Sequence, residues 1–181
     1  MRAKGATTST NYQFLASCFN EARNLPLEHP DRLRGCGLEG ASRTGKDWDK
    51  CVFACQYIGT FTGKKINFFR DTFANLKKTT YRTLKEVWGL FGYDTSLFNK
   101  SATEIHYNGN IITFMGVNDD PERAKGLESD IAFLGEAMSL VKEHCDQIEK
   151  RLRDYLGKKT VGFLQRLCRK HPYFINGKRV K

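Results

Sequence analysis

The sequence predicts an α/β protein with one open, mostly parallel sheet that is flanked by helices and carries an antiparallel hairpin. Apolar segments of strand length alternate with amphipathic helical segments along most of the 181 residues. A glycine-rich loop joins the first short strand to a helix. The dipeptide Asn108-Gly109 has apolar residues on both sides, and this is a strong signal for a tight hairpin.

The composition indicates one compact domain followed by a basic tail. The chain is 40% hydrophobic, and at this length about two-thirds of the unfolded surface is expected to be buried. Residues 158–181 contain eight of the 30 basic side chains and none of the 20 acids, so residues 1–157 carry a net charge of 22 − 20 = +2. The tail is either a solvated terminus or a contact for nucleic-acid phosphates.

No signal for a membrane or a secretory pathway is found. The sequence contains no apolar run of about 18 residues, and its first residues lack the apolar stretch of a signal peptide, so we expect a cytosolic protein. The six cysteines form no C-x-x-C pair and no zinc spacing, which predicts buried free thiols. They are Cys18, Cys36, Cys51, Cys55, Cys145 and Cys168.

The first half of the chain predicts two helices and two strands. We expect helices over 11–25 and 46–59, a short strand within 33–40, and a strand over 64–71. In that strand Ile66 and Phe68 should face one side of the sheet and Phe69 the other. The apolar stripe of the first helix consists of Phe14, Leu15, Cys18, Phe19 and Ala22.

The second half predicts a long helix over 72–92, with Leu76, Leu84, Val87 and Leu90 as its apolar positions. The remaining expected elements follow in chain order. They are the hairpin over 103–117, a polar loop over 118–129, a strand over 130–137, a helix over 139–157 and a last strand over 159–164.

The segment EGASRTGKDWDK, residues 39–50, contains the G-x-x-x-x-G-K pattern of a phosphate-binding loop. Such a loop follows a strand and opens a helix, so that backbone N–H groups surround the phosphates and the lysine reaches the β- and γ-phosphates. The alternative is a glycine turn with a surface lysine. The predicted nucleotide-binding residues are Gly40, Ala41, Ser42, Arg43, Thr44, Gly45, Lys46 and Asp47, with Arg43 adding charge near the γ-phosphate.

The second half of such a site is an apolar strand that ends in acids, and DIAFLGEA has this form. Glu136 ends the strand and could orient and deprotonate the attacking water, unless it is an ordinary exposed carboxylate. Two positions depart from the pattern. Asp47 stands where a Ser or Thr hydroxyl normally holds Mg²⁺, and Gly135 stands where an Asp normally precedes the glutamate.

With these motifs in place, the chain resembles the ATPase domain of the large terminase subunit of tailed bacteriophages. The matching segments are YQF, GASRTGK, INFFRDT, EIHYNGNIITFMGVND, AKGLESDIAFLGEA and IEKRLR, in order from about residue 11 to 156. The resemblance implies a P-loop NTPase of the ASCE type that uses ATP and Mg²⁺. It also implies a homo-oligomeric ring on the portal protein that works with the small terminase subunit. Such a ring drives double-stranded DNA into a procapsid in the cytoplasm of the bacterial host.

The resemblance assigns roles by position. Tyr12 and Gln13 match the adenine-side motif, Lys46 and Arg43 the phosphate loop, and Glu136 the catalytic glutamate. Lys125 falls where many members have the arginine that enters the neighbouring subunit's site, although a lysine lacks the planar fork of an arginine and nearby Arg123 could take its place. Arg70 matches an arginine after the second strand and receives no role. Lys77, Lys78 and Arg82 are candidate DNA contacts, or else a solvated face.

The chain also departs from this family. We expect residues 1–157 to form the ATPase domain and 158–181 to add a last strand and the tail. The tail contains no acid, so no nuclease activity is expected, and the usual coupling motif after the last strand is not recognisable. The chain is therefore an ATPase domain separated from its nuclease, a naturally short form, or a truncated relic.

For the metal, we hypothesise that Asp47 replaces the carboxylate missing at Gly135, which would make nucleotide binding weak and dependent on Mg²⁺. The alternative is a catalytically weak or inactive nucleotide-binding or interaction protein.

Overall fold

The computed structural model describes residues 9–24, 35–37, 45–99, 103–136, 139–152, 163–166, 174–175 and 178–179. Its helices are α1 (Thr10–Asn24), α2 (Lys46–Thr60), α3 (Phe73–Leu76), α4 (Arg82–Leu90), α5 (Pro121–Gly126) and α6 (Lys142–Lys150). A π-helical segment, η1 (Lys77–Tyr81), joins α3 to α4, and a short 3₁₀ turn, η2 (Thr95–Leu97), follows them. The strands are β1 (Gly35–Gly37), β2 (Lys65–Arg70), β3 (Glu104–Tyr107), β4 (Asn110–Gly116), β5 (Ile131–Leu134), β6 (Phe163–Arg166), β7 (Phe174–Ile175) and β8 (Lys178–Arg179).

Six of these strands form one sheet in the order β1-β6-β5-β2-β4-β3. All neighbouring pairs are parallel except β3 and β4, which form the antiparallel hairpin. Strand β6 therefore lies between β1, which precedes the glycine-rich loop in the sequence, and β5, which ends two residues before Glu136. The structure confirms the predicted α/β architecture, and β7 and β8 pair separately.

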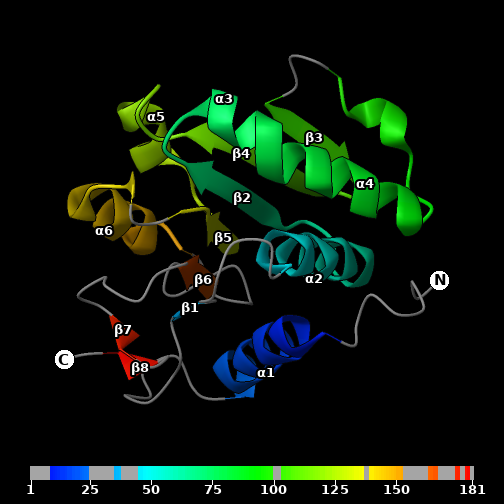
Figure 1. The fold of residues 1–181 in the computed structure, drawn as a ribbon, viewed down its shortest axis with the longest axis horizontal. Helices are drawn as coiled ribbons and strands as arrows, with labels where there is room; N and C mark the ends of the chain where they lie inside the picture. The colour runs from blue at the N-terminus through cyan, green and yellow to red at the C-terminus, as the bar shows by residue number, and fades with distance from the viewer. Residues whose placement is uncertain are drawn as a thin grey trace.

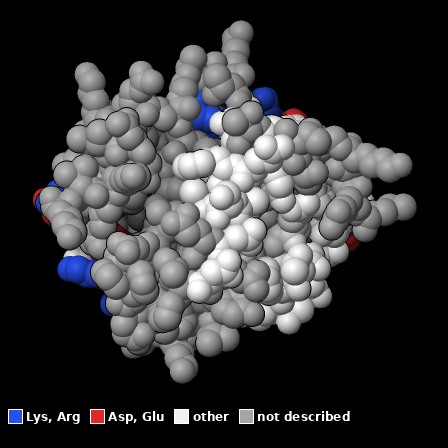
Figure 2. All heavy atoms as spheres, turned by 90° about the horizontal axis from the view of Figure 1, so that it is seen from below, with Lys and Arg blue, Asp and Glu red and all other residues white. Residues whose placement is uncertain are grey.

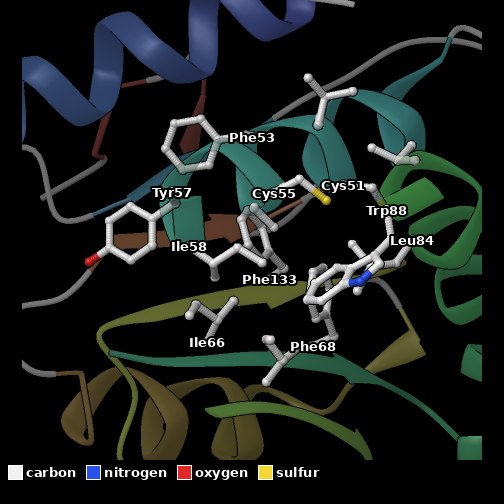
Figure 3. Close-up of a cluster of buried hydrophobic side chains, with 14 of the residues drawn as sticks. Cys51, Phe53, Cys55, Tyr57, Ile58, Ile66, Phe68, Leu84, Trp88 and Phe133 are labelled. Atoms are coloured by element: carbon white, nitrogen blue, oxygen red, sulfur yellow. The ribbon is translucent and has the colours of Figure 1, made fainter. Parts of the chain in front are cut away.

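The sheet separates two clusters of buried side chains. Helices α2 and α4 cover one face, where Ile66 and Phe68 of β2 are buried (Figures 1 and 3). Phe69 points to the other face and packs in the cluster that contains Cys145 and Ile148 of α6. The prediction that Ile66 and Phe68 face one side of the sheet and Phe69 the other is thus confirmed, as expected for successive strand residues.

Aromatic rings fill the larger cluster. The Phe68 ring stacks on Phe133 at 4.9 Å and on Phe114 at 5.6 Å between ring centroids, and these residues are direct neighbours on β5 and β4. Trp88 of α4 is fully buried, and its indole N–H donates to the Asp94 carbonyl at 3.0 Å. Trp88 and the stacked rings belong to the same buried cluster between the helices and the sheet.

Two predicted local features are confirmed. Asn108 and Gly109 have φ angles of 50° and 71°, the left-handed backbone that a two-residue type I′ hairpin turn needs. Cys18, Cys51, Cys55 and Cys145 are buried free thiols, whereas Cys36 and Cys168 lie outside the side chains that the structure describes. Among the described residues, no helix is both long enough and apolar enough to span a bilayer.

Other expectations were wrong. Helix α5 occupies part of the predicted loop, because the Asp120 side chain accepts from the Arg123 N–H at 3.0 Å and Pro121 suits the first helical turn. Leu90 is 60% exposed, since the buried face of α4 is set by Leu84, Val87 and Trp88. Helix α6 ends at Lys150, and Leu152 then forms an isolated parallel β-bridge with Ser129.

Candidate nucleotide site

The start of α2 and the carboxyl ends of β2 and β5 carry the side chains with candidate chemistry. Gly45, with φ of 77°, precedes α2, and its carbonyl accepts from the Asp49 N–H at 2.9 Å. Lys46 and Asp47 form the first turn of the helix. The other predicted loop residues, Gly40 to Thr44 with Arg43 among them, lie outside the described residues.

Asp47 is paired with a lysine of its own helix. The Lys50 Nζ forms an ion pair with Asp47 Oδ1, and the side chains of Lys50 and Asp47 are 1% and 40% exposed. Lys50 is one of the largest fully buried side chains among the described residues. The first turn of α2 thus presents an internal ion pair at the position where the loop pattern expects a hydroxyl.

Asp49 joins the beginning of α1 to the beginning of α2. Its carboxylate accepts from Ser9 Oγ at 2.6 Å and from Asn11 Nδ2 at 3.1 Å, and the residue is 2% exposed. Ser9 Oγ in turn accepts from the Tyr12 N–H at 3.0 Å, in the manner of a helix cap. The segment predicted to lie on the adenine side is therefore fixed to the helix that carries Lys46.

The predicted adenine-side residues lie on α1. The Tyr12 hydroxyl donates to Gln56 Oε1 of α2, and the Tyr12 ring lies 6.5 Å from the Phe53 ring. An open, mainly aromatic pocket runs between the two helices beside Tyr12. Gln13 is exposed. The adenine-side roles of Tyr12 and Gln13 stay predictions.

Glu136 contacts a buried arginine from the neighbouring strand. Arg70 ends β2, is 8% exposed, and its Nη2 lies 2.6 Å from Glu136 Oε1. The two residues meet because β2 and β5 are adjacent and parallel, so that their carboxyl ends lie at one edge of the sheet. The Glu136 side chain is 64% exposed, and a ligand at this edge can reach it.

The backbone at Glu136 is in the left-handed region, with φ of 48°. A residue with a side chain adopts this conformation at a cost of about 1–3 kcal/mol and keeps it where the surroundings require it. Here the Glu136 carbonyl accepts from both the backbone N–H and the hydroxyl of Ser139 at 2.8 Å, and the Gly135 N–H donates to the Phe69 carbonyl at 2.8 Å. These bonds fix the direction in which the carboxylate leaves the strand.

Arg70 also contacts the helix that follows its strand. Its Nη1 donates to Thr79 Oγ1 at 2.6 Å, and that hydroxyl donates to the Asn75 carbonyl at 2.8 Å. Thr79 belongs to the π-helical segment η1, and such wider turns often mark functional sites in helices. A chain of contacts thus joins η1 to Glu136 through one guanidinium.

Asp71 supplies a second negative charge beside Arg70. Burial alone would raise the pKa of the Asp71 carboxyl, but hydrogen bonds from the Thr72 N–H and the Asn75 amide lower it, as does the Arg70 charge. The Arg70 Nε lies 3.3 Å from Asp71 Oδ1. The arginine therefore lies between the carboxylates of residues 71 and 136.

The predicted inter-subunit residues lie on α5 and pair with acids of the same chain. Lys125 Nζ is 2.7 Å from Glu122 Oε1, and Arg123 Nη2 is 3.5 Å from Glu104 Oε1. Both basic side chains are partly exposed, and ion pairs at the surface contribute little to stability. A role toward a second subunit stays a prediction for both.

The predicted DNA contacts lie on η1 and α4. Lys78 and Arg82 are exposed, while the Lys77 Nζ lies 6.0 Å from the centre of the Phe73 ring. Arg82 Nε is 3.8 Å from Glu86 Oε1, which partly neutralises this face. Figure 2 views the molecule from below relative to Figure 1, and the described surface on this side is mostly uncharged, with basic and acidic groups near its margin.

The described donors do not fit Mg²⁺. Asp47 is bound to Lys50, Gly135 has no side chain, and Glu136 is bound to Arg70. Within the described ranges no three His, Cys, Asp or Glu side chains gather into a possible metal site. Mg²⁺ is usually bound through one or two carboxylates besides the phosphates, and among the described side chains at this edge Asp47 is available only if Lys50 releases it.

Sequence reasoning missed Lys50, Asp49 and Thr79. The signal for Lys50 was its i,i+3 spacing from Asp47 next to the apolar run CVFAC, which placed it on a buried face. No signal identified the Asp49 contacts, because Ser9 and Asn11 lie about 40 positions away. Thr79 could not be assigned, because the π-helical turn that brings it to Arg70 has no reliable sequence pattern.

Comparison with solved structures gives the fold a precedent. The chain superimposes on the large terminase of a thermophilic bacteriophage with a TM-score of 0.64 and 17% identity, covering 87% of this chain and 38% of that one. The same terminase in complex with ADP and with ATP-γ-S matches with TM-scores of 0.64 and 0.62. No model of a known protein family matches the sequence, and no curated protein sequence matches it. The chain therefore shares the fold of the matched part of the phage terminase, which corresponds to 38% of that chain.

Proposed function

We propose that this chain is a terminase-like ATPase domain that binds ATP at the carboxyl edge of its sheet and hydrolyses it. The observation that carries the proposal is the meeting of two elements at that edge. Lys46 begins α2 directly after Gly45, and Glu136 leaves β5 beside Arg70, in a fold that matches terminase structures with ADP and ATP-γ-S.

Each side chain at this edge has a separate proposed role, which follows from its position. Lys46 and the N–H groups at the start of α2 bind phosphate oxygens, because a helix N-terminus favours anions. Glu136 orients the attacking water and accepts its proton. Arg70 is a positioning residue that fixes the orientation of the Glu136 carboxylate. Arg43 and the loop from Gly40 to Thr44 complete the phosphate cradle.

The wider role that we propose is that of a DNA-packaging motor. In this role the chain acts with a portal protein and a small terminase subunit as a ring on a procapsid in the host cytoplasm. Exposed Lys78 and Arg82 support contact with DNA phosphates, which would be independent of base sequence and sensitive to salt. Lys125 or Arg123 is the proposed contact to a neighbouring subunit.

A second candidate function is nucleotide binding with little or no turnover. It is favoured by the Asp47–Lys50 pair and by Gly135, because these leave the expected metal position without a free carboxylate. Such a protein would serve as a nucleotide-responsive interaction partner within the packaging machinery.

Binding and turnover separate these functions. Calorimetric titration with ADP should show binding by the wild type, and Lys46→Ala should weaken it by about tenfold or more through the loss of a charge-assisted contact. Lys85→Ala, on the exposed face of α4, is the matched control and should bind like the wild type. If neither protein binds nucleotide, both candidate functions are wrong.

Turnover is then measured as phosphate release from ATP, with and without double-stranded DNA. For the ATPase, Glu136→Gln should reduce kcat by about a hundredfold or more, the usual contribution of a general base. If wild type and variant release phosphate equally slowly while both bind ADP, the second candidate is correct.

A further inference from the structure

The first turns of α2 contain a buried lysine to which the sequence assigned no role. Lys50 lies one helical turn after Lys46, so both side chains leave the same face of the helix. Lys50 is 1% exposed, and an ammonium group is costly to bury without a compensating charge. Asp47 provides that charge.

The same ammonium lies against the end of β5. A Cβ atom built on Gly135 would be 4.0 Å from Lys50 Nζ and 3.6 Å from the Phe69 carbonyl oxygen. Any longer side chain at this position, a carboxylate included, would reach the ammonium. Because Gly135 has no side chain, the space beside its Cα is open, and the Lys50 ammonium lies next to that space.

A divalent cation would compete with Lys50 for this place. In a P-loop site the metal lies between the residue after the loop lysine and the carboxylate at the end of the acidic strand. In this chain those positions are Asp47, whose carboxylate pairs with Lys50, and Gly135, which has no carboxylate. A bound Mg²⁺ would have to displace a buried ammonium from its partner and remain close to it, although like charges repel.

We propose that the Lys50 ammonium replaces the divalent metal as the second cation that faces the nucleotide phosphates, so that the site binds nucleoside di- and triphosphates without Mg²⁺. This inference rests on the proposed nucleotide-binding function. Lys46 and Lys50 then place two ammonium groups in the first turns of α2, the second of them buried and paired with Asp47. Asp47 orients the second of them, and its pairing removes the repulsion that a free carboxylate would exert on phosphate. The structure thereby gives Asp47 a role other than that of a metal ligand.

The experiment is a calorimetric titration of the whole chain with ADP, once with excess Mg²⁺ and once with EDTA. We expect the dissociation constants for ADP in the two buffers to agree within about threefold, because no metal contact is lost in EDTA. A tenfold difference in the dissociation constant would correspond to ~1.4 kcal/mol of binding free energy. Electron paramagnetic resonance with Mn²⁺ should detect no protein-bound metal when ADP is present. Loss of binding in EDTA, or one Mn²⁺ per bound nucleotide, would overturn the proposal.

Variants test the lysine itself. Lys50→Met should weaken ADP binding in EDTA by about tenfold or more, and Mg²⁺ should restore part of it because Asp47 becomes free to bind a metal. Lys85→Met is the matched control and should change neither value. Gly135→Asp retains the buried lysine and should weaken binding in EDTA by placing a competing carboxylate beside it. If both site variants bind ADP in EDTA like the wild type, Lys50 does not face the phosphates.

If the wild type binds ADP in neither buffer, the proposed nucleotide-binding function fails, and this inference fails with it. If it binds ADP only with Mg²⁺, the proposed function stands and Lys50 is not the second cation. The two titrations therefore distinguish the two failures.

Discussion

Arg70 Nη2 lies 2.6 Å from Glu136 Oε1, and this contact joins the ends of two adjacent parallel strands. The arginine is buried and the glutamate is largely exposed, so the protein fixes one partner and presents the other. The Glu136 backbone is itself held at φ of 48°. The contact with Arg70 therefore fixes the orientation of the Glu136 carboxylate.

Replacing this arginine should affect turnover more than binding. Arg70→Met frees the Glu136 carboxylate to rotate, and we expect kcat for ATP hydrolysis to fall by about tenfold or more, while the dissociation constant for ADP changes by less than about threefold. Steady-state kinetics and calorimetry provide the two values. Arg70→Lys should restore little, because a lysine lacks the fork that reaches Thr79 and Glu136 together. An unchanged kcat in Arg70→Met would contradict the positioning role.

The hydroxyl of Thr79 should matter for the same reason. Thr79→Val keeps the shape of the side chain but removes its bond to Arg70, and we expect a loss of about 1 kcal/mol in the free energy of unfolding. The fall in kcat should be smaller than for Arg70→Met. Thr83→Val, one turn further along the same helical segment, is the control for urea unfolding. If both valine variants behave alike, the η1 contact does not support Arg70.

Asp49 should stabilise the attachment of α1 to α2. Asp49→Ala removes a buried carboxylate that accepts from Ser9 and Asn11, and we expect unfolding to become easier by about 1–3 kcal/mol. A double-mutant cycle with Ser9→Ala isolates the Ser9–Asp49 bond. A coupling free energy near zero would mean that the bond seen in the structure contributes nothing to stability.

The stacked rings of the core predict a contrast between two apolar residues. Phe68→Ala removes the ring between Phe114 and Phe133, and it should lower the free energy of unfolding by about 3–5 kcal/mol. Leu90→Ala, at a 60% exposed position, should change it by less than about 0.5 kcal/mol. Urea denaturation of the two variants measures both values, and comparable losses would place Leu90 in the core.

The buried thiols of α2 should be unreactive at neutral pH. Burial raises the pKa of both Cys51 and Cys55, so the nucleophilic thiolate is scarce and access is blocked. Iodoacetamide labelling followed by peptide mass spectrometry should leave both unmodified in the folded chain and modify both in urea. Modification of either in the folded chain would show that α2 opens locally.

Much of the fold could be predicted because periodicity reports local structure. The alternation in β2, the Asn108-Gly109 turn and the helix after Lys46 each follow from neighbouring residues. The α5 helix was missed because a cap and a proline outweighed the polar composition of that segment. Helical periodicity also predicts Leu90 as an apolar position of the long helix, whereas the buried face of α4 runs through Leu84, Val87 and Trp88.

The sequence by itself determined the order of the elements, the presence of the loop lysine and the position of a glutamate at a strand end. Only the tertiary structure decided what Glu136 and Asp47 contact. Parallel strands bring their carboxyl ends to one edge, so Arg70 meets Glu136 across 66 positions, a separation over which no periodicity acts. An unpaired buried ammonium is costly, and Asp47 offsets this cost for Lys50 in the place beside Gly135. Packing against the sheet therefore determined the electrostatics of a site whose residues were already visible in the sequence.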